Sequence, residues 1–231
     1  MQYLIKILKS IKIVIITSLT PLLITVISSC IYNKITSKDI TIFINYYLIY
    51  ILLFYYLVTL IYLIRKYKII FKRLSLVKYY SYVSIGISLS CILNMLIFLI
   101  NKTEVTGAPN KLILLITSSL IGPIYEEIIF RSIFYNKLKE FNSTKKSIII
   151  TTIVFLLLHL NITKIIYAFI LGLILNTIYE KDNNITSPII IHIGANMISL
   201  FLFNYTPLIL ILSIILLIVS LYTILDKRIY L

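Results

Sequence analysis

Long runs without a charged side chain are the feature that most limits what this 231-residue chain can fold into. An α-helix of about 20 apolar residues crosses a bilayer core about 30 Å thick. The uncharged runs cover 13–33, 40–64, 79–101, 112–125, 147–163, 165–179 and 183–225. Charged residues make up only 13% of the chain, too few to coat a water-soluble domain of this size. The sequence therefore predicts an all-α, polytopic transmembrane helix bundle.

The spacing of these runs predicts about eight spans. The last run is too long for one crossing, and it breaks naturally at the polar turn that ends in Pro207. The fourth run becomes long enough only if it continues through three ionisable residues to about residue 136. The run 165–179 is short for a crossing, so we expect a short or tilted helix paired with the span before it. No polar stretch could form an aqueous domain, so we expect one membrane domain over 1–231, with a motif-bearing core at about 112–203.

The net charge of +14 is distributed as a membrane protein requires. Almost every Lys and Arg lies in a gap between apolar runs, which favours a lipid bilayer and argues against a nucleic-acid partner. Most of the 22 basic residues lie in alternate gaps, namely Lys6, Lys9, Lys12, Arg65, Lys66, Lys68, Lys72, Arg73, Lys78, Lys137, Lys139, Lys145, Lys146, Lys181, Lys227 and Arg228. With eight spans these gaps share one side of the membrane, and the positive-inside rule predicts that both termini are cytoplasmic.

Span one has an alternative interpretation. A basic start, an apolar stretch and the sequence ISSC at 27–30 resemble a bacterial lipoprotein signal. The apolar region of a signal is about 7 to 15 residues, shorter than the run 13–33, so we expect a retained helix. Cys30 and Cys91 lie inside apolar runs without metal-ligand spacing, and we interpret both as buried small hydrophobic residues.

A few ionisable residues lie inside the apolar spans. Of the eight acidic residues only Glu126 and Glu127 do so, and both histidines, His159 and His192, also do. Each charged side chain at a helix centre costs about 2.5 to 3.5 kcal/mol, so such residues indicate function or tight pairing. Counting helical rise from the nearest charged gap places Glu126, His159 and His192 at one level, about 15 to 20 Å into the membrane.

The spacing within the fourth span separates the two glutamates. Glu127 and Arg131 stand at i and i+4 with the acid first, the favoured order for a helical ion pair. Glu126 lies about 100° around the helix and is expected outside that pair. A carboxylate in a dry site away from a cation suits a general base. We also expect Gly122 and Pro123 to kink the helix beside a polar cavity.

Three short patterns occur in order along the chain, EEIIFR at 126–131, FLLLH at 155–159 and HIGAN at 192–196. In the last two, the end residues stand at i and i+4 on one helical face. The patterns resemble the EExxxR, FxxxH and HxxxN motifs of the CPBP intramembrane proteases. That family includes the type II CAAX prenyl endopeptidases and bacterial bacteriocin-processing or bacteriocin-immunity relatives. The resemblance covers about residues 122–199, a third of the chain.

The resemblance implies hydrolysis of a peptide bond in a membrane-associated peptide or protein. Glu126 with His159 would activate water, and His192 with Asn196 would bind the scissile carbonyl and its developing oxyanion. The acid–arginine pair would fix the helix that carries the catalytic glutamate. The candidate site residues are therefore Glu126, Glu127, Arg131, His159, His192 and Asn196.

Use of a metal is a separate question, since the family is often described as metalloproteases. Glu126, His159 and His192 could hold zinc with an open position for water. The sequence has no HExxH, and the same three residues could hold water by hydrogen bonds alone. We favour a glutamate-based mechanism without a required cofactor, with zinc as the alternative.

The substrate and two other functions remain open. A composition rich in Ile, Lys, Asn and Tyr suggests an AT-rich prokaryotic genome, and hence a multi-pass protein of a prokaryotic plasma membrane that serves peptide maturation or bacteriocin self-immunity. One alternative is a non-catalytic immunity or regulatory protein of the same fold. Another is a proton-coupled transporter, for which no internal repeat is evident.

Overall fold

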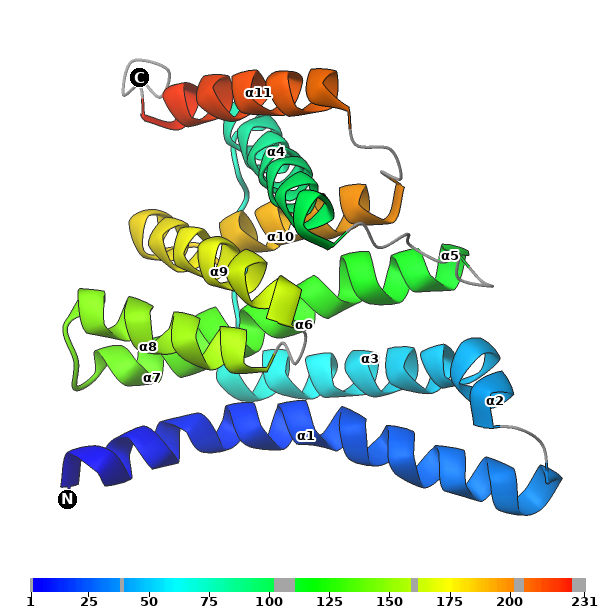
Figure 1. The fold of residues 1–231 in the computed structure, drawn as a ribbon. Coiled ribbons are helices and arrows are strands. Elements are labelled where there is room, and N and C mark those ends of the chain that lie inside the picture. Colours follow the sequence, from blue (N-terminus) through cyan, green and yellow to red (C-terminus); the bar gives the residue numbers. More distant parts are fainter. Residues whose placement is uncertain (1, 38–39, 102–110, 159–161, 202–205, 226–231) are drawn as a thin grey trace. The chain divides into compact units, whose positions relative to one another are not determined.

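The computed structural model describes residues 2–37, 40–101, 111–158, 162–201 and 206–225, and these ranges contain helices and no strand (Figure 1). The helices form two compact units. Unit 1 comprises Met1–Ile69 and Gly107–Ser147, and unit 2 comprises Ile70–Thr106 and Ile148–Leu231. The all-α membrane fold predicted from the apolar runs is confirmed.

Unit 1 contains two long helices, α1 (Gln2–Thr36) and α3 (Leu48–Tyr67), and the short helix α2 (Ile40–Tyr46) that precedes α3. It also contains one composite helix made of α5 (Lys111–Leu114), η1 (Leu115–Ile121), α6 (Gly122–Glu127), η2 (Ile128–Tyr135) and α7 (Asn136–Lys139). The π-helical segments η1 and η2 flank α6. In Figure 1, α3 lies between α1 and the composite helix, and it contacts both.

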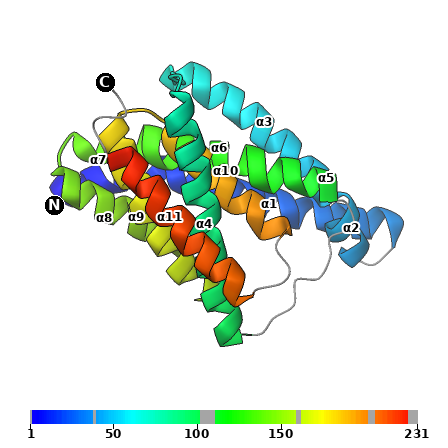
Figure 2. The same cartoon turned by 90° about the horizontal axis from the view of Figure 1, so that it is seen from above.

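Unit 2 is centred on α4. Its helices are α4 (Leu76–Asn101), α9 (Ile162–Asp182), α10 (Thr186–Phe201), α11 (Pro207–Leu225) and most of α8 (Thr144–Leu157). Figures 1 and 2 show α4 between α10 and α11, and both contacts are extensive. The core of this unit includes Tyr82, Ile85, Leu171, Leu175 and Ile191.

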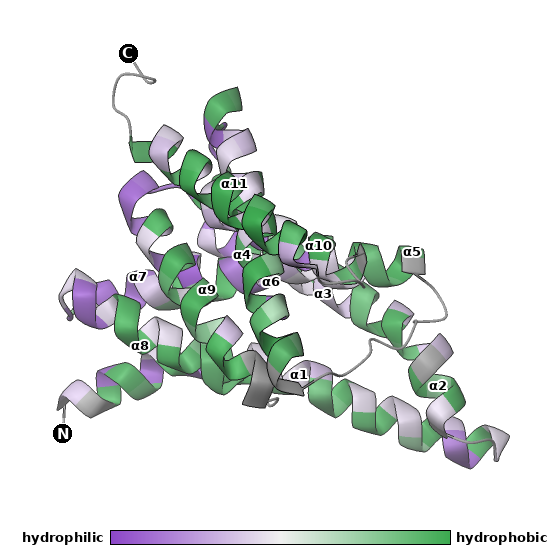
Figure 3. Ribbon diagram, turned by 45° about the horizontal axis from the view of Figure 1, so that its top comes forward, coloured by the Kyte–Doolittle hydropathy of each residue, from purple (hydrophilic) through white to green (hydrophobic). Residues whose placement is uncertain are grey.

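Within the described ranges, five helices are long and apolar enough to cross a membrane: Ile5–Thr36, Leu48–Tyr67, Leu76–Leu99, Leu112–Lys139 and Pro207–Leu225. The other three expected spans coincide with α8, α9 and α10. Figure 3 shows largely hydrophobic helices, with hydrophilic residues mainly at helix ends and connections such as that between α7 and α8. Many large apolar side chains of α1, α3 and α11 are exposed, as lipid-facing residues must be.

Some boundaries differ from the predicted ones. Span two begins at Leu48, because the chain breaks at Tyr47 and leaves α2 as a short separate helix. The sixth span is longer than its uncharged run, since α9 continues through the charged residues at both ends, as helix ends near the membrane boundary permit. Cys91 is buried as expected, but the prediction for Cys30 is wrong, because this residue is exposed on α1.

Contacts between polar ends agree with the alternation of basic gaps. In unit 1, the Nζ atom of Lys137, after span four, lies 5.7 Å from the ring centroid of Tyr67, after span two. In unit 2, Lys78 Nζ, before span three, lies 3.0 Å from the Oδ1 atom of Asp182, after span six. Each pair of gaps therefore lies at the same end of its helices. That this end is cytoplasmic stays a prediction.

Candidate active site

The helix that carries the EExxxR motif is widened just before the motif. Pro123 has no N–H and crowds the carbonyl of the preceding turn, which favours an interruption of the α-helical ladder. The structure accommodates it with η1, at whose end the N–H of Gly122 donates to the Thr117 carbonyl oxygen. A Cβ at position 122 would lie 3.0 Å from that oxygen, so glycine suits the tight turn. Such π-helical turns are frequent at functional sites.

Glu127 and Arg131 form the ion pair predicted from their spacing. Arg131 Nη1 donates to Glu127 Oε1 at 2.8 Å, and both side chains are 0% exposed. The pair links α6 to η2. Two charges buried together stabilise each other, but either one alone in this place would be costly.

Glu126, one residue earlier, is partly buried, and its Oε2 atom is buried. Arg131 interacts electrostatically with both glutamates, so Glu126 is not remote from a cation as the spacing had suggested. Although the two glutamates point in different directions around the helix, the long side chain of Arg131 brings its positive charge within electrostatic range of both carboxylates.

A cluster of tyrosines that sequence reasoning did not select surrounds this part of α6. The rings of Tyr56 and Tyr125 lie 4.8 Å apart, and Tyr56 is within electrostatic range of Glu126. Tyr125 donates to the Thr17 carbonyl oxygen at 2.9 Å, and its hydroxyl lies 3.2 Å from that of Tyr55. These contacts tie α1 and α3 to the helix that carries the motif. The pairing of tyrosines at 55 and 56 in an apolar span was the available signal.

In unit 2, the structure brings together residues of the FxxxH and HxxxN motifs. Phe155 on α8 and His192 on α10 are both buried, and their ring centroids lie 6.2 Å apart with an interplanar angle of 78°. Phe155 also faces α9, where a Cβ on Gly172 would meet its Cδ1 atom at 3.3 Å. Asn196 stands one turn after His192 and is partly buried.

Polar side chains connect the helices around these residues. Asn94 of α4 donates to Ser199 of α10 at 2.9 Å, and Asn176 of α9 donates to Thr152 of α8 at 2.9 Å. Both asparagines therefore join neighbouring helices by hydrogen bonds, as polar side chains inside membrane spans commonly do.

A close helix contact in unit 2 lies at the HxxxN motif. A Cβ on Gly86 of α4 would lie 2.1 Å from the Ile191 carbonyl oxygen, and one on Gly194 would lie 2.9 Å from that of Val83. Two glycines therefore allow the backbones of α4 and α10 to meet, as small residues do between membrane helices. Gly86 was not selected from the sequence, although its spacing of four from Ser90 was the available signal.

Of the six predicted site residues, the structure describes five. Glu126, Glu127 and Arg131 lie in unit 1, and His192 and Asn196 lie in unit 2. His159 lies outside the described residues. A carboxylate and two imidazoles are suitable zinc donors, but within the described ranges no three His, Cys, Asp or Glu side chains are clustered.

Comparisons with known proteins concern the same part of the chain. Residues 108–198 match the family described as "Type II CAAX prenyl endopeptidase Rce1-like". The chain is 30% identical over 84 residues to "Putative membrane peptidase YdiL" of Bacillus subtilis (strain 168). That alignment covers 36% of this chain and only 34%, about a third, of the relative's length. No solved structure matches the chain significantly. The resemblance inferred from the three motifs is confirmed over residues 108–198, the segment that carries them and that matches this family of membrane peptidases.

Proposed function

We propose that this protein is an intramembrane endopeptidase that hydrolyses a peptide bond of a membrane-associated peptide or protein. The observation that carries the proposal is the family match over residues 108–198, which contains all three motifs in order. The candidate residues within it are Glu126, Glu127, Arg131, His159, His192 and Asn196. Membrane-spanning helices in the same segment support a reaction at the bilayer.

In this proposal Glu126 acts with His159 as the general base that takes a proton from the attacking water. A positioned base accelerates such reactions by about 100- to 10,000-fold. His192 and Asn196 donate hydrogen bonds to the oxyanion that develops on the scissile carbonyl, and one such donor is worth about 100- to 1,000-fold. The ion pair of Glu127 and Arg131 supports the turn on which Glu126 stands.

The favoured mechanism requires no cofactor. If zinc is bound, Glu126, His159 and His192 would hold it, and it would supply Lewis-acid activation of water. With zinc bound, His192 would serve as a ligand and Asn196 would remain as the oxyanion donor, whereas the role of the buried ion pair would be unchanged.

The biological setting that we propose is a prokaryotic plasma membrane. There the enzyme would mature a secreted peptide or protect the cell from its own bacteriocin. A non-catalytic immunity or regulatory protein of the same fold is the competing function, and it differs in needing no intact Glu126.

The decisive experiment compares wild type with Glu126→Gln. Each purified full-length protein is incubated in detergent with a mixed library of membrane peptides, with and without a chelator, and products are identified by mass spectrometry. Glu180→Gln is the matched control, because it makes the same chemical change at a carboxylate outside the proposed site.

Cleavage by wild type and Glu180→Gln but not by Glu126→Gln supports the protease and reveals its sequence preference. Persistence of this cleavage with chelator supports the glutamate-based mechanism, whereas its loss supports the zinc alternative. Identical output from wild type and a folded Glu126→Gln variant would overturn the proposal in favour of the non-catalytic protein.

A further inference from the structure

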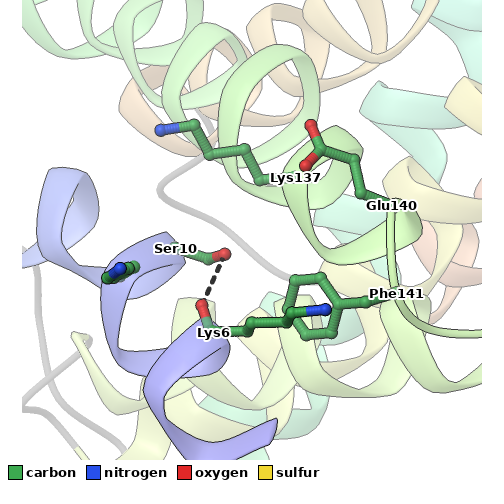
Figure 4. Close-up of a pocket in the computed structure, with 6 residues that line it drawn as sticks. Lys6, Ser10, Lys137, Glu140 and Phe141 are labelled. Carbon is green, nitrogen blue, oxygen red and sulfur yellow. Dashed lines mark hydrogen bonds between the residues drawn. The ribbon is translucent and has the colours of Figure 1, made fainter. Parts of the chain in front are cut away.

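A basic pocket lies in unit 1, away from the candidate catalytic residues of that unit. It has a volume of about 350 Å³ and is lined by Lys6, Lys9, Ser10, Lys137, Glu140 and Phe141. Figure 4 shows Lys6 and Ser10 on one helix, opposite Lys137, Glu140 and Phe141 at the end of α7 and the turn that follows. Three ammonium groups and one carboxylate leave the pocket with a surplus of positive charge, which favours an anionic ligand.

The wall of this pocket is held by contacts between segments far apart in the sequence. Tyr3 donates to Asn142 Oδ1 at 2.7 Å, and its ring meets that of Phe141 edge-on at 5.9 Å. The Nζ atom of Lys6 lies 5.9 Å from the centroid of the Phe141 ring. The Ser10 hydroxyl donates to the Lys6 carbonyl oxygen at 3.0 Å, which leaves the lysines as the principal donors for a ligand.

The pocket lies where two membrane spans meet the polar boundary. The apolar helix Ile5–Thr36 begins beside it, and the apolar helix Leu112–Lys139 ends beside it. Basic pockets between transmembrane helices at this depth suit the phosphate of a lipid headgroup. A wholly polar ligand from bulk water matches this position less well, because it has no apolar part to contact the neighbouring membrane spans.

A row of exposed apolar side chains extends from the pocket along α1. Residues spaced by seven lie on nearly the same face of a helix, so Ile16 and Leu23 continue the line of Lys9. Ile16 is 50% exposed and Leu23 is 59% exposed. A ligand with an anionic head and apolar chains therefore matches both parts of this surface.

We propose that this pocket binds the phosphate headgroup of an anionic phospholipid, whose acyl chains lie along the exposed face of α1. Free phosphate shares the headgroup chemistry but lacks the chains. The binding site is independent of the proposed protease activity, so either proposal can fail without the other.

The test measures lipid binding to the purified full-length protein by native mass spectrometry. The probes are phosphatidylglycerol, phosphatidylcholine with the same acyl chains, and inorganic phosphate as a competitor. The triple variant Lys6→Gln/Lys9→Gln/Lys137→Gln removes the pocket lysines. Its matched control, Lys34→Gln/Lys145→Gln/Lys146→Gln, removes three exposed lysines that do not line the pocket.

We expect saturable binding of phosphatidylglycerol, preferred over phosphatidylcholine. The pocket variant should lose on the order of 100-fold in affinity, because each juxtamembrane lysine contributes to holding an anionic lipid. The control should lose much less. Glu140→Gln keeps all three lysines and removes the opposing carboxylate, so it should bind phosphatidylglycerol more tightly, and it tests the site even if the triple variant does not fold.

Three results would overturn the assignment. Equal losses in the pocket variant and its control would mean that net charge alone attracts the lipid. Unchanged or weaker binding by Glu140→Gln would contradict the electrostatic argument. Displacement of phosphatidylglycerol by inorganic phosphate at equal concentration would mean that the pocket recognises phosphate and not a lipid.

Discussion

The ring of Phe155 meets the imidazole of His192 edge-on, with ring centroids 6.2 Å apart. Phe155 is the first residue of one motif and His192 is the first of another, and 37 positions of sequence separate them. The phenylalanine of FxxxH thus makes a tertiary contact of its own, since its ring packs against the histidine of α10. Both side chains are buried, so this contact limits the orientations open to the imidazole.

Phe155→Ala should destabilise the protein by about 3 to 5 kcal/mol, since it deletes a fully buried ring. The same substitution should also lower proteolytic activity, because the His192 imidazole loses the ring contact that limits its orientation. Phe155→Leu retains most of the volume and should cost less stability. Thermal unfolding in detergent and peptide cleavage measure the two effects. Full activity in Phe155→Ala would show that the ring does not position His192.

Arg131→Met should destabilise the protein by about 3 to 5 kcal/mol, because it leaves the Glu127 carboxylate buried without its cation. The double variant Glu127→Leu/Arg131→Met removes both charges and should recover most of that loss. A double-mutant cycle of thermal unfolding free energies tests this coupling. Equal instability of the single and double variants would mean that packing, and not charge, explains the cost.

Gly86→Ala should separate α4 from α10, because the added Cβ would lie 2.1 Å from the Ile191 carbonyl oxygen. Overpacking of this kind costs about 1 to 3 kcal/mol. Gly172→Ala is the matched control, since its Cβ would meet side-chain atoms at 3.3 Å that can adjust more easily. The unfolding temperatures of the two variants, each compared with that of wild type, measure this difference in stability. An equal or larger loss in Gly172→Ala would contradict the proposed close backbone contact.

The stability of the polar end of unit 2 should depend on pH through Asp182. Burial raises the pKa of this carboxyl group, but hydrogen bonds from Ser187 and Tyr82 and the ion pair with Lys78 together outweigh it, so the pKa lies below its usual range. The stabilisation is therefore complete above the unfolded pKa of about 3.9, and it is lost as the pH falls through the folded value.

Asp182→Asn should accordingly lower the unfolding temperature at pH 7 and reduce its further fall below about pH 4. Unfolding curves of wild type and variant, measured between about pH 3 and about pH 8, provide the comparison. Glu180→Gln serves as the control, because it changes a carboxylate on the same helix outside this cluster. An acid-induced loss of the same size in Asp182→Asn and wild type would exclude Asp182 as its source.

The pairing of Glu127 with Arg131 could be predicted because both partners lie on one helix, where spacing fixes distance. His192 and Asn196 could likewise be placed one turn apart, since both lie on α10. The position of Tyr56 near Glu126 could not, because it depends on how α3 packs against α6. The break before Leu48 was also missed, since apolar content does not distinguish one continuous helix from two.

The amino-acid sequence is enough to predict the helical membrane fold, the local ion pair and the family resemblance of the motif-bearing segment. These follow from hydropathy, from the 3.6-residue helical period and from residue order, none of which needs long-range contacts. Three other features arise only when the helices pack: the ring of Phe155 contacts that of His192, Gly86 lets α4 approach α10, and lysines of α1 and α7 line one pocket. Such contacts depend on side-chain shape and helix crossing, which membrane helices set by close packing rather than by a hydrophobic pattern.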